Sequence, residues 1–295
     1  MAEETSRRYT LSNRYIFTGR LVMQTAFHIG GGRLTLSGSD SPVILTPEGQ
    51  PFIPGSSFKG SLRSTTEKIV PALPESAELS SCGLVELSDE EQLAAQQQQK
   101  WVCSSLRQRE FAQRYRNAPN DKNIFTQARK ELCHTCQLFG SPFSASLMSI
   151  QDLYLADMTW FDGLIQHRDG VAIDRDSEKA RDRLKYDFDV VPATTSFSMN
   201  ITLENASPKD LQLISIGLSE FVNGYGVIGG KRSRGLGACI LEDFKVTCID
   251  LASGDQKERS LRLKNHLLKI LPEPLDGPTF VHDQIDTLFA DNNAR

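Results

Sequence analysis

The strongest constraint on the fold is a stretch in the second half of the chain that carries a complete set of helix signals. Residues 207–226, "SPKDLQLISIGLSEFVNGYG", start with a serine that can cap a helix and a proline that suits its first turn, and they end in glycine. Residues 195–205 alternate apolar and polar side chains as a half-buried strand does. Residues 238–250 also predict a strand. This part of the chain therefore predicts the order strand, helix, strand.

The first part of the chain contains the same kinds of element. Residues 15–27 are rich in aromatic and β-branched side chains and predict a strand, and residues 146–160 predict another. Between them, residues 56–70 predict a helix that Ser56 or Ser57 caps. Without the intervening insertions the order is strand, helix, strand, strand, helix, strand. This is the split βαβ, or ferredoxin-like, arrangement that also underlies RNA-recognition domains, so the predicted fold class is α+β.

Two stretches interrupt this order and one follows it. Residues 71–145 lose clean periodicity and are interpreted as an insertion, part helix and part loop, without an apolar core. Residues 161–194 are too polar for a core of their own and predict a projecting hairpin or flexible arm. We expect residues 15–250 to form a single domain that carries both insertions, and residues 251–295 to be a peripheral C-terminal extension.

The charge of the chain is uneven. Its 295 residues have a net charge of −4, so the overall charge does not indicate a nucleic-acid partner. Between Lys100 and Glu131, however, eight Lys or Arg residues stand against three acidic ones. Such a basic stripe suits a polyanion, and a solvated helix face explains it equally well.

Targeting signals and cysteine usage suggest a cellular compartment. The sequence shows no signal peptide and no run of about 18 apolar residues, so neither secretion nor a transmembrane helix is expected. Six cysteines in a chain of this length do not resemble a secreted disulfide scaffold. These features together predict a protein of the reducing cytoplasm.

Four cysteines have the pattern of a metal site. Cys133 and Cys136 form a Cys-x-x-Cys pair, the spacing that places two thiolates on one tetrahedral zinc ion. Cys82 and Cys103 are the obvious other ligands, although His134 could replace one cysteine. Four thiolates would make a closed structural zinc site rather than a catalytic one. Buried free thiols and redox chemistry are the alternatives.

Two clusters of glycine, serine and basic residues suit a sugar-phosphate backbone. Residues 229–237, "GGKRSRGLG", pack four glycines and three cations between a helix and a strand, which makes backbone N–H groups and positive charge available to phosphates. Residues 54–64, "PGSSFKGSLRS", combine a helix start, which favours anions, with Lys59 and Arg63 on one helix face. A helix C-cap followed by a turn, and an amphipathic helix with a basic face, are the alternatives.

The stretch "FHIGGGRLTLSGSDSPVI", residues 27–44, places three glycines and an isolated aspartate between two short apolar runs. The glycines allow positive φ and a close approach by another chain. Asp40 lies in a loop bounded by Gly38 and Pro42, where an ordinary surface turn is the alternative to a functional role. His28, at the end of the predicted first strand, could contact a ligand or be a structural histidine.

The chain has no zinc-protease, nucleophile-elbow or kinase signature, yet its motifs together resemble a known family. The segments "FHIGGGRLTLSGSDSPVI", "PFIPGSSFKGSLRS", "CHTCQLFGS", "GVAIDRDSEKARDR" and "GGKRSRGLGAC" occur in the order seen in the RAMP superfamily. The resemblance is greatest to the backbone subunit of type III CRISPR effector complexes and covers residues 15–250. The combination of motifs is specific, whereas each one alone is weak. The long glutamine-rich insertion departs from the family pattern.

The resemblance implies an architecture and partners. The fold would be a modified RNA-recognition domain, or palm, with a zinc-bearing insertion at residues 71–145 and a β-hairpin thumb at residues 161–194. The partners would be CRISPR RNA, target RNA, other RAMP subunits or further copies of this chain, and the large polymerase/cyclase-like subunit of the effector. No membrane partner is implied.

The resemblance also implies an activity and its residues. Asp40 would cleave paired target RNA at a flipped nucleotide with a divalent cation, expected to be Mg²⁺. A catalytically inactive RNA-binding scaffold subunit of the same complex is the alternative. The residues that would bind RNA are His28, Gly30, Gly31, Ser56, Ser57, Lys59, Arg63, Gly229, Gly230, Lys231, Arg232, Ser233 and Arg234.

Overall fold

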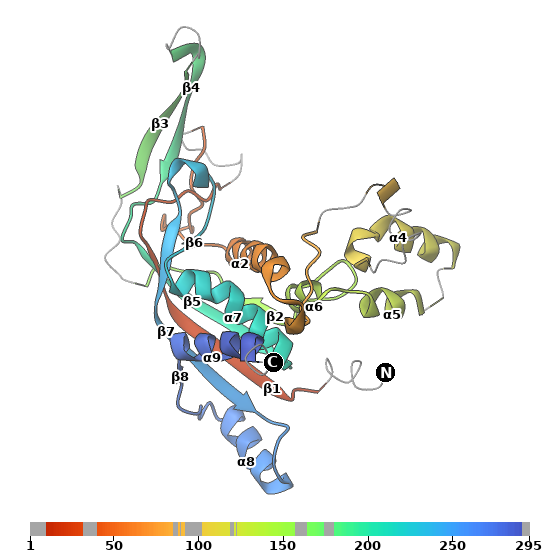
Figure 1. Ribbon diagram of the computed structural model, residues 1–295. Coiled ribbons are helices and arrows are strands. Elements are labelled where there is room, and N and C mark those ends of the chain that lie inside the picture. The colour runs from red at the N-terminus through yellow and green to blue at the C-terminus, as the bar shows by residue number, and fades with distance from the viewer. Residues whose placement is uncertain are drawn as a thin grey trace.

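The computed structural model of the chain has a mixed α+β fold built on an antiparallel sheet, as the sequence predicts (Figure 1). The structure describes residues 10–31, 40–84, 88, 90–91, 102–118, 121, 123–156, 164–173 and 180–290. Within these ranges, only the backbone of residues 172–173 and 180–185 is described.

The central sheet has the strand order β2-β5-β1-β7-β6, with β8 paired to β7. Strand β1 lies in the middle and pairs antiparallel with β5 on one side and with β7 on the other. Each of the four predicted strand regions contributes a strand. The bounds are β1 Asn13–Met23, β2 Met148–Ile150, β5 Ser196–Glu204, β6 Gly226–Val227, β7 Ala238–Asp250 and β8 Leu275–Asp276.

Strand β2 is much shorter than the sequence predicts. After Ile150 the regular strand ends, although Gln151, Tyr154 and Ala156 still form backbone hydrogen bonds with β5. Leu153 and Leu155 then form only isolated bridges, with Ile53 and Phe197 respectively. The predicted strand of residues 146–160 is therefore a short strand followed by an irregular edge segment in which Leu153 is buried, as far as residue 156; residues 157–160 lie outside the described part of the chain.

Two predicted helices, α2 (Gly55–Ile69) and α7 (Pro208–Val222), pack against each other and against the sheet. Helix α7 starts as predicted, with a capping box in which the side chains of Ser207 and Asp210 accept each other's backbone N–H groups.

The start of α2 differs from the prediction of a serine cap. Its N-cap is Pro54, and the N–H of Gly55 donates to Oδ1 of Asp152 at 2.8 Å. Glycine is required here because a Cβ at this position would collide with the carbonyl oxygen of Ile150. An acidic side chain from a distant segment thus takes the place expected for Ser56 or Ser57.

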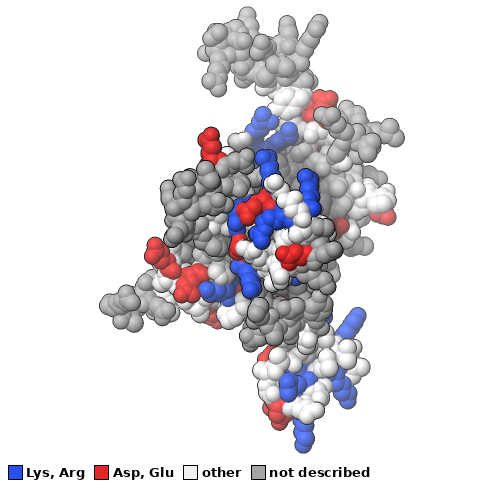
Figure 2. All heavy atoms as spheres, turned by 90° about the vertical axis from the view of Figure 1, so that its right-hand side faces the viewer, with Lys and Arg blue, Asp and Glu red and all other residues white. Residues whose placement is uncertain are grey.

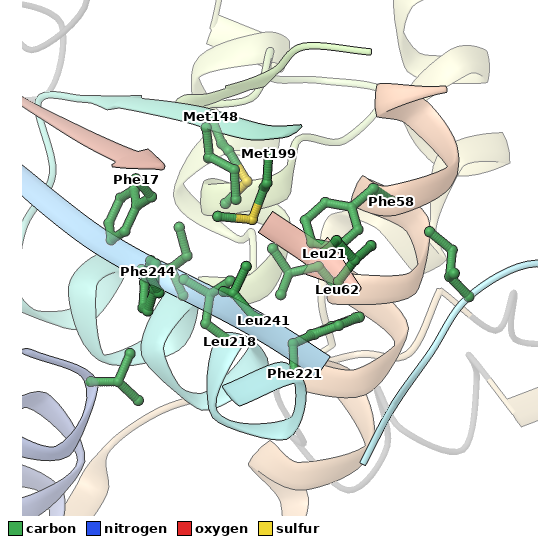
Figure 3. Packing of buried hydrophobic residues seen from close by; sticks show 14 of the residues in the cluster. Phe17, Leu21, Phe58, Leu62, Met148, Met199, Leu218, Phe221, Leu241 and Phe244 are labelled. Carbon is green, nitrogen blue, oxygen red and sulfur yellow. The ribbon is translucent and has the colours of Figure 1, made fainter. Parts of the chain in front are cut away.

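The core lies between these helices and the sheet (Figure 3). Phe17 and Leu21 of β1 and Leu241 of β7 are buried opposite side chains of both helices. The rings of Phe58 in α2 and Phe221 in α7 lie 5.1 Å apart. This packing fixes α2 against the sheet and so determines where its exposed face lies.

Residues predicted to project as a hairpin form strands β3 (Gln166–Ile173) and β4 (Ala180–Val190), a separate two-stranded sheet that extends from one end of the molecule (Figure 1). The base of the hairpin is anchored. Phe188 and Val190 are buried, and Val191 forms a bridge with Phe27 just beyond β1.

The insertion contains α4 (Gln108–Asn117), α5 (Asn123–Lys130) and α6 (His134–Phe139). The expectation that it lacks an apolar core is wrong, because Phe111, Ile124 and Ala128 form a small buried cluster. Short 3₁₀ turns complete the segment: η1 Val70–Ala72, η2 Glu75–Ala77 and η3 Ser104–Leu106.

The C-terminal segment is not peripheral throughout. Helix α8 (Gln256–Leu267) buries none of its residues. Helix α9 (Gly277–Phe289), however, packs against α7, and its Phe280, Val281 and Leu288 belong to the main core. Strand β8 pairs with β7 and returns the chain to the sheet just before α9. Among the described residues, no helix has the length and apolarity needed to cross a membrane.

Two glycines in the packed helices give a test of the fold. A Cβ at Gly217 in α7 would lie 2.5 Å from Oγ1 of the buried Thr66, whereas a Cβ at Gly60 in α2 would meet nothing within 4 Å. We expect Gly217→Ala to lower the free energy of unfolding by about 1–2 kcal/mol through overpacking. Gly60→Ala should raise it by up to about 1 kcal/mol through helix propensity. Urea denaturation of both variants measures the two changes, and equal effects would contradict this packing.

Candidate nucleic-acid interface and metal site

The side chain of His28 forms hydrogen bonds with two other parts of the chain, at Ser41 and at Asp189. Its Nδ1 lies 2.7 Å from the carbonyl oxygen of Asp189 in β4, and its Nε2 lies 3.2 Å from Oγ of Ser41. Because a carbonyl only accepts hydrogen bonds, Nδ1 carries the proton and donates, which leaves Nε2 to accept from the Ser41 hydroxyl. His28 is 6% exposed. Its role in this structure is therefore structural, and the expected contact of its side chain with RNA does not fit.

The glycine-rich segment after β6 packs on the backbone of His28. The N–H of Gly230 donates to the His28 carbonyl oxygen at 2.9 Å. Gly229 has a φ of 84°, and a Cβ there would lie 2.5 Å from the same oxygen, so only glycine fits. The loop then forms the short turn η4 (Arg232–Arg234), whose residues are all exposed. Its two arginines are thus presented to solvent, as a phosphate-binding loop requires.

Cations of this loop also contact aromatic residues of the hairpin. Nζ of Lys231 lies 4.2 Å from the ring centroid of Phe188 and 5.2 Å from that of Tyr186. The guanidinium of Arg234 lies 5.5 Å from the Tyr186 ring. These are cation–π distances. Burial, with a contribution from Arg234, lowers the pKa of Lys231. The loop and strand β4 are therefore neighbours.

Asp40 lies next to the same segment of β4. It is exposed, and its backbone N–H donates to Oδ1 of Asp187 at 2.6 Å. Its own Oδ2 accepts from the N–H of Asp187 at 3.3 Å. The next residue, Ser41, accepts at its carbonyl oxygen from the N–H of Asp189 at 3.0 Å. The loop that carries Asp40 is thus bonded to β4 at three points.

Gly30 and Gly31 lead from the end of β1 towards this loop. Gly30 is exposed and forms a bridge with Val43, and the N–H of Gly31 donates to the carbonyl oxygen of Pro42 at 3.0 Å. The segments on either side of Asp40 therefore run together. Residues 32–39, including the third glycine of this motif, lie outside the described part of the chain.

Helix α2 contributes less to this surface than the sequence predicts. Ser56 is exposed and Ser57 is half-buried. Nζ of Lys59 lies 3.4 Å from the carbonyl oxygen of Met148, and burial lowers its pKa. The hydroxyl of Ser61 donates to the carbonyl oxygen of Val227 at 2.6 Å. Helix α2 therefore contacts strand β6, and β6 leads directly into the loop of residues 229–235 (Figure 1).

The structure brings together the four cysteines that the sequence predicts as metal ligands. The Sγ atoms of Cys82, Cys103, Cys133 and Cys136 all lie within 4.8 Å of one another. Thiolates at about 2.3 Å from one tetrahedral ion are roughly 3.8 Å apart, so this donor set fits a closed zinc site. His134 is not part of the set, because its Nδ1 accepts from the N–H of Ser80 at 3.1 Å.

Arg63 belongs to this cysteine cluster and not to the exposed surface. Its guanidinium donates to Sγ of Cys136 at 3.3 Å, to the carbonyl oxygen of Gly140 at 2.8 Å and to Glu67 at 2.8 Å. The side chain is 15% exposed. The expected contact of Arg63 with RNA therefore does not fit, and the residue supplies positive charge next to thiolates.

The environment of the cluster favours thiolate at one position. Hydrogen bonds from Cys133, and then from Cys136 and Cys82, lower the pKa of the Cys103 thiol. The hydroxyl of Ser105 also donates to Cys136 at 3.2 Å. Hydrogen bonds from Cys103 raise the pKa of the Cys82 and Cys136 thiols, so an ion would have to displace the protons of those two cysteines.

Part of the basic stripe of the insertion is engaged within the protein. Arg107 pairs with Glu110 and Glu131, and the guanidinium groups of Arg107 and Arg114 lie 5.3 and 5.2 Å from the centroid of the Phe111 ring. Figure 2 shows blue and red side chains interleaved on the side of the molecule that the insertion occupies. This pattern favours a solvated helix face over a dedicated polyanion site.

Sequence comparison gives a family and named relatives. A family model described as the RAMP superfamily matches residues 20–240. A protein of Enterococcus italicus named "CRISPR system Cms endoribonuclease Csm3" is 24% identical over 255 residues, which are 83% of this chain and 96% of that protein. Proteins of the same name from Methanothermobacter thermautotrophicus and Methanocaldococcus jannaschii are 45% and 43% identical over 56 and 61 residues, or 18% and 20% of this chain. In those two matches the chain spans 23% and 25% of the relative's length.

The contact between Arg63 and the cysteine cluster predicts a measurable effect on metal binding. We expect Arg63→Gln to weaken zinc binding by about 10-fold, because a partner of a ligating thiolate is lost. Cys103→Ser should abolish tight binding. Competition with a chromophoric chelator measures both, with Lys68→Gln at an exposed position of the same helix as the control. Unchanged zinc affinity in Arg63→Gln would show that the guanidinium does not support the ion.

Proposed function

The chain belongs to the RAMP superfamily, and from this premise we propose that it is a backbone subunit of a type III CRISPR effector complex. In this proposal it binds CRISPR RNA and cleaves complementary target RNA. The similarity to proteins named as Csm3 endoribonucleases supports both parts. The observation that carries the proposal is the meeting of an exposed aspartate, a cationic glycine-rich loop and a projecting hairpin around His28.

The proposed architecture assigns a role to each part of the fold. The central sheet with α2 and α7 is the palm, and its strand order places the first and third strands of the βαββαβ unit side by side in the middle of the sheet. The hairpin of β3 and β4 is the thumb. It would separate a target nucleotide from the guide duplex next to Asp40. Other RAMP subunits or further copies would continue this arrangement along the RNA.

The loop of residues 229–235 is the proposed grip on the sugar-phosphate backbone. Arg232, Ser233 and Arg234 are exposed. Gly229 and Gly230 pack closely against the backbone of His28, which fixes the start of the loop. Contacts of this kind hold the backbone and do not read the bases, which suits a system in which base pairing provides sequence specificity.

For cleavage at Asp40 the protein would mainly have to orient the reacting groups of the RNA, because the RNA supplies its own nucleophile. The nucleophile would be the 2′-hydroxyl of the displaced ribonucleotide, which loses its proton and attacks the adjacent phosphorus while the 5′-oxygen of the next nucleotide leaves. The exposed carboxylate of Asp40 can accept that proton, and its attachment to β4 holds it in place. A divalent cation bound by this carboxylate and by phosphate oxygens would offset the charge that develops on the phosphate.

The cysteine cluster has a structural role in this proposal. A zinc ion held by Cys82, Cys103, Cys133 and Cys136 would join the start of the insertion to α6, which packs against α7. Four sulfur ligands leave no open position for a substrate. The ion would therefore stabilise the insertion and take no part in cleavage.

One observation favours a catalytically inactive scaffold as the second candidate. Oδ2 of Asp40 already accepts a hydrogen bond from the backbone N–H of Asp187, so the carboxylate has a structural partner within the protein. In that case RNA binding through the glycine-rich loop remains, and the carboxylate only closes the loop.

Replacement of Asp40 separates the two candidates. We expect complexes that contain Asp40→Ala to lose cleavage opposite this subunit by at least about 100-fold, since a general base or cation ligand is removed. RNA binding and assembly should be unchanged. Denaturing electrophoresis of labelled target RNA measures the loss. The control is Glu48→Ala, an exposed carboxylate in the neighbouring turn. Unchanged cleavage in the Asp40 variant would identify the inactive scaffold.

The charge of the loop predicts a change in salt dependence. Arg232→Gln and Arg234→Gln should each reduce the slope of log affinity against log salt concentration by about 0.7–1, because each removes one phosphate contact. Fluorescence anisotropy with a labelled single-stranded RNA measures the slope. Arg116→Gln, on the exposed face of α4, serves as the control and should leave it unchanged. If the α4 variant alters the slope and the loop variants do not, the insertion is the RNA-binding surface.

A further inference from the structure

The contact between Asp40 and Asp187 joins residues that are 147 positions apart in the chain. Oδ1 of Asp187 accepts from the N–H of Asp40 at 2.6 Å, and Oδ2 of Asp40 accepts from the N–H of Asp187 at 3.3 Å. Each carboxylate therefore bonds the backbone of the other residue. A third hydrogen bond, from the N–H of Asp189 to the carbonyl oxygen of Ser41, continues the pairing along β4.

Strand β4 is a firm support for this loop. Phe188 and Val190 are 6% and 0% exposed, and the carbonyl oxygen of Asp189 accepts from the buried ring of His28. Lys231 lies over the Phe188 ring. The backbone from Tyr186 to Val190 is therefore held by the core and by the glycine-rich loop. The exposed residue Asp40 has its backbone amide fixed to this support through the side chain of Asp187.

We propose that Asp187 is a positioning residue for Asp40. Its carboxylate fixes the backbone amide of Asp40, so that the Asp40 side chain faces the scissile phosphate beside the base of the hairpin. This inference rests on the proposed cleavage function. Orientation of a reacting group within a fraction of an ångström is a large part of catalysis. Of the three hydrogen bonds that hold this loop to β4, the one to Oδ1 of Asp187 fixes the amide of Asp40 itself, so its loss loosens the orientation of the Asp40 side chain.

The chemistry distinguishes positioning from direct participation. To hold the Asp40 amide, residue 187 needs only an acceptor oxygen, which asparagine also provides. To bind a cation or accept a proton, it needs a negative charge, which asparagine lacks. Asp187→Asn and Asp187→Ala therefore have different outcomes under the two roles.

The experiment compares Asp187→Ala and Asp187→Asn in the assembled complex by single-turnover cleavage of target RNA over a range of Mg²⁺ concentrations. We expect the alanine variant to cleave at least about 10-fold more slowly than the parent protein because of lost orientation. The asparagine variant should remain close to the parent, with the same Mg²⁺ concentration at half-maximal rate. Asp169→Ala is the matched control, because Asp169 lies directly opposite Asp187 in the hairpin.

A second measurement does not depend on cleavage. Amide hydrogen exchange at Asp40, followed by mass spectrometry of the full chain, should become faster in Asp187→Ala and stay protected in Asp187→Asn. Unchanged exchange in the alanine variant overturns the positioning role whether or not the complex cleaves RNA. Loss of cleavage in both variants, or a higher Mg²⁺ requirement in the asparagine variant, also overturns it in favour of direct participation.

The outcomes separate this inference from the proposed function. If the parent complex does not cleave, or if Asp40→Ala cleaves normally, the nuclease function is wrong, and hydrogen exchange alone decides whether Asp187 holds the loop. If Asp40→Ala is inactive and Asp187→Ala cleaves normally, the nuclease function stands and the positioning role is wrong.

Discussion

The candidate site depends on one buried imidazole. The ring of His28 donates to the carbonyl oxygen of Asp189 and accepts from the hydroxyl of Ser41, while the His28 carbonyl oxygen accepts from the N–H of Gly230. Three segments from different parts of the chain thereby meet at one residue just beyond β1. The ring is buried and has a hydrogen-bond partner at each nitrogen, so neither polar atom is left unpaired. The aspartate loop, the glycine-rich loop and the hairpin therefore share one rigid base.

Local patterns predicted the elements of the fold well. Alternation and capping signals located β1, β5, β7, α2 and α7, because each signal depends on residues within one turn or one strand. They did not predict that Asp152 would bond the start of α2, or that α9 would enter the core. Both features depend on contacts between distant segments. The periodicity of one segment carries no information about such contacts. The clustering of the four cysteines was predicted because a Cys-x-x-Cys pair is typical of a zinc site, and a tetrahedral zinc ion needs two further ligands.

The site was predicted less completely. Spacing on the helix placed Lys59 and Arg63 on one face, but spacing does not reveal what covers that face, and the cysteine cluster covers Arg63. His28 carried no local sign that both of its nitrogens are bonded inside the protein. Asp187 was missed because no motif links it to Asp40, and its role depends on the register of a hairpin against a distant loop. For the glycine-rich loop the structure shows that residues 232–234 are exposed, and their contact with RNA stays a prediction.

An electron cryomicroscopy structure of the assembled complex with guide and target RNA tests the central claim most directly. The account predicts that the guide backbone runs along residues 229–234 and that a displaced target nucleotide lies at the base of the β3–β4 hairpin. The Asp40 carboxylate should then be in contact with the adjacent phosphate or with a cation bound to it. RNA that follows another face of the sheet, with Asp40 facing bulk solvent, would contradict the account.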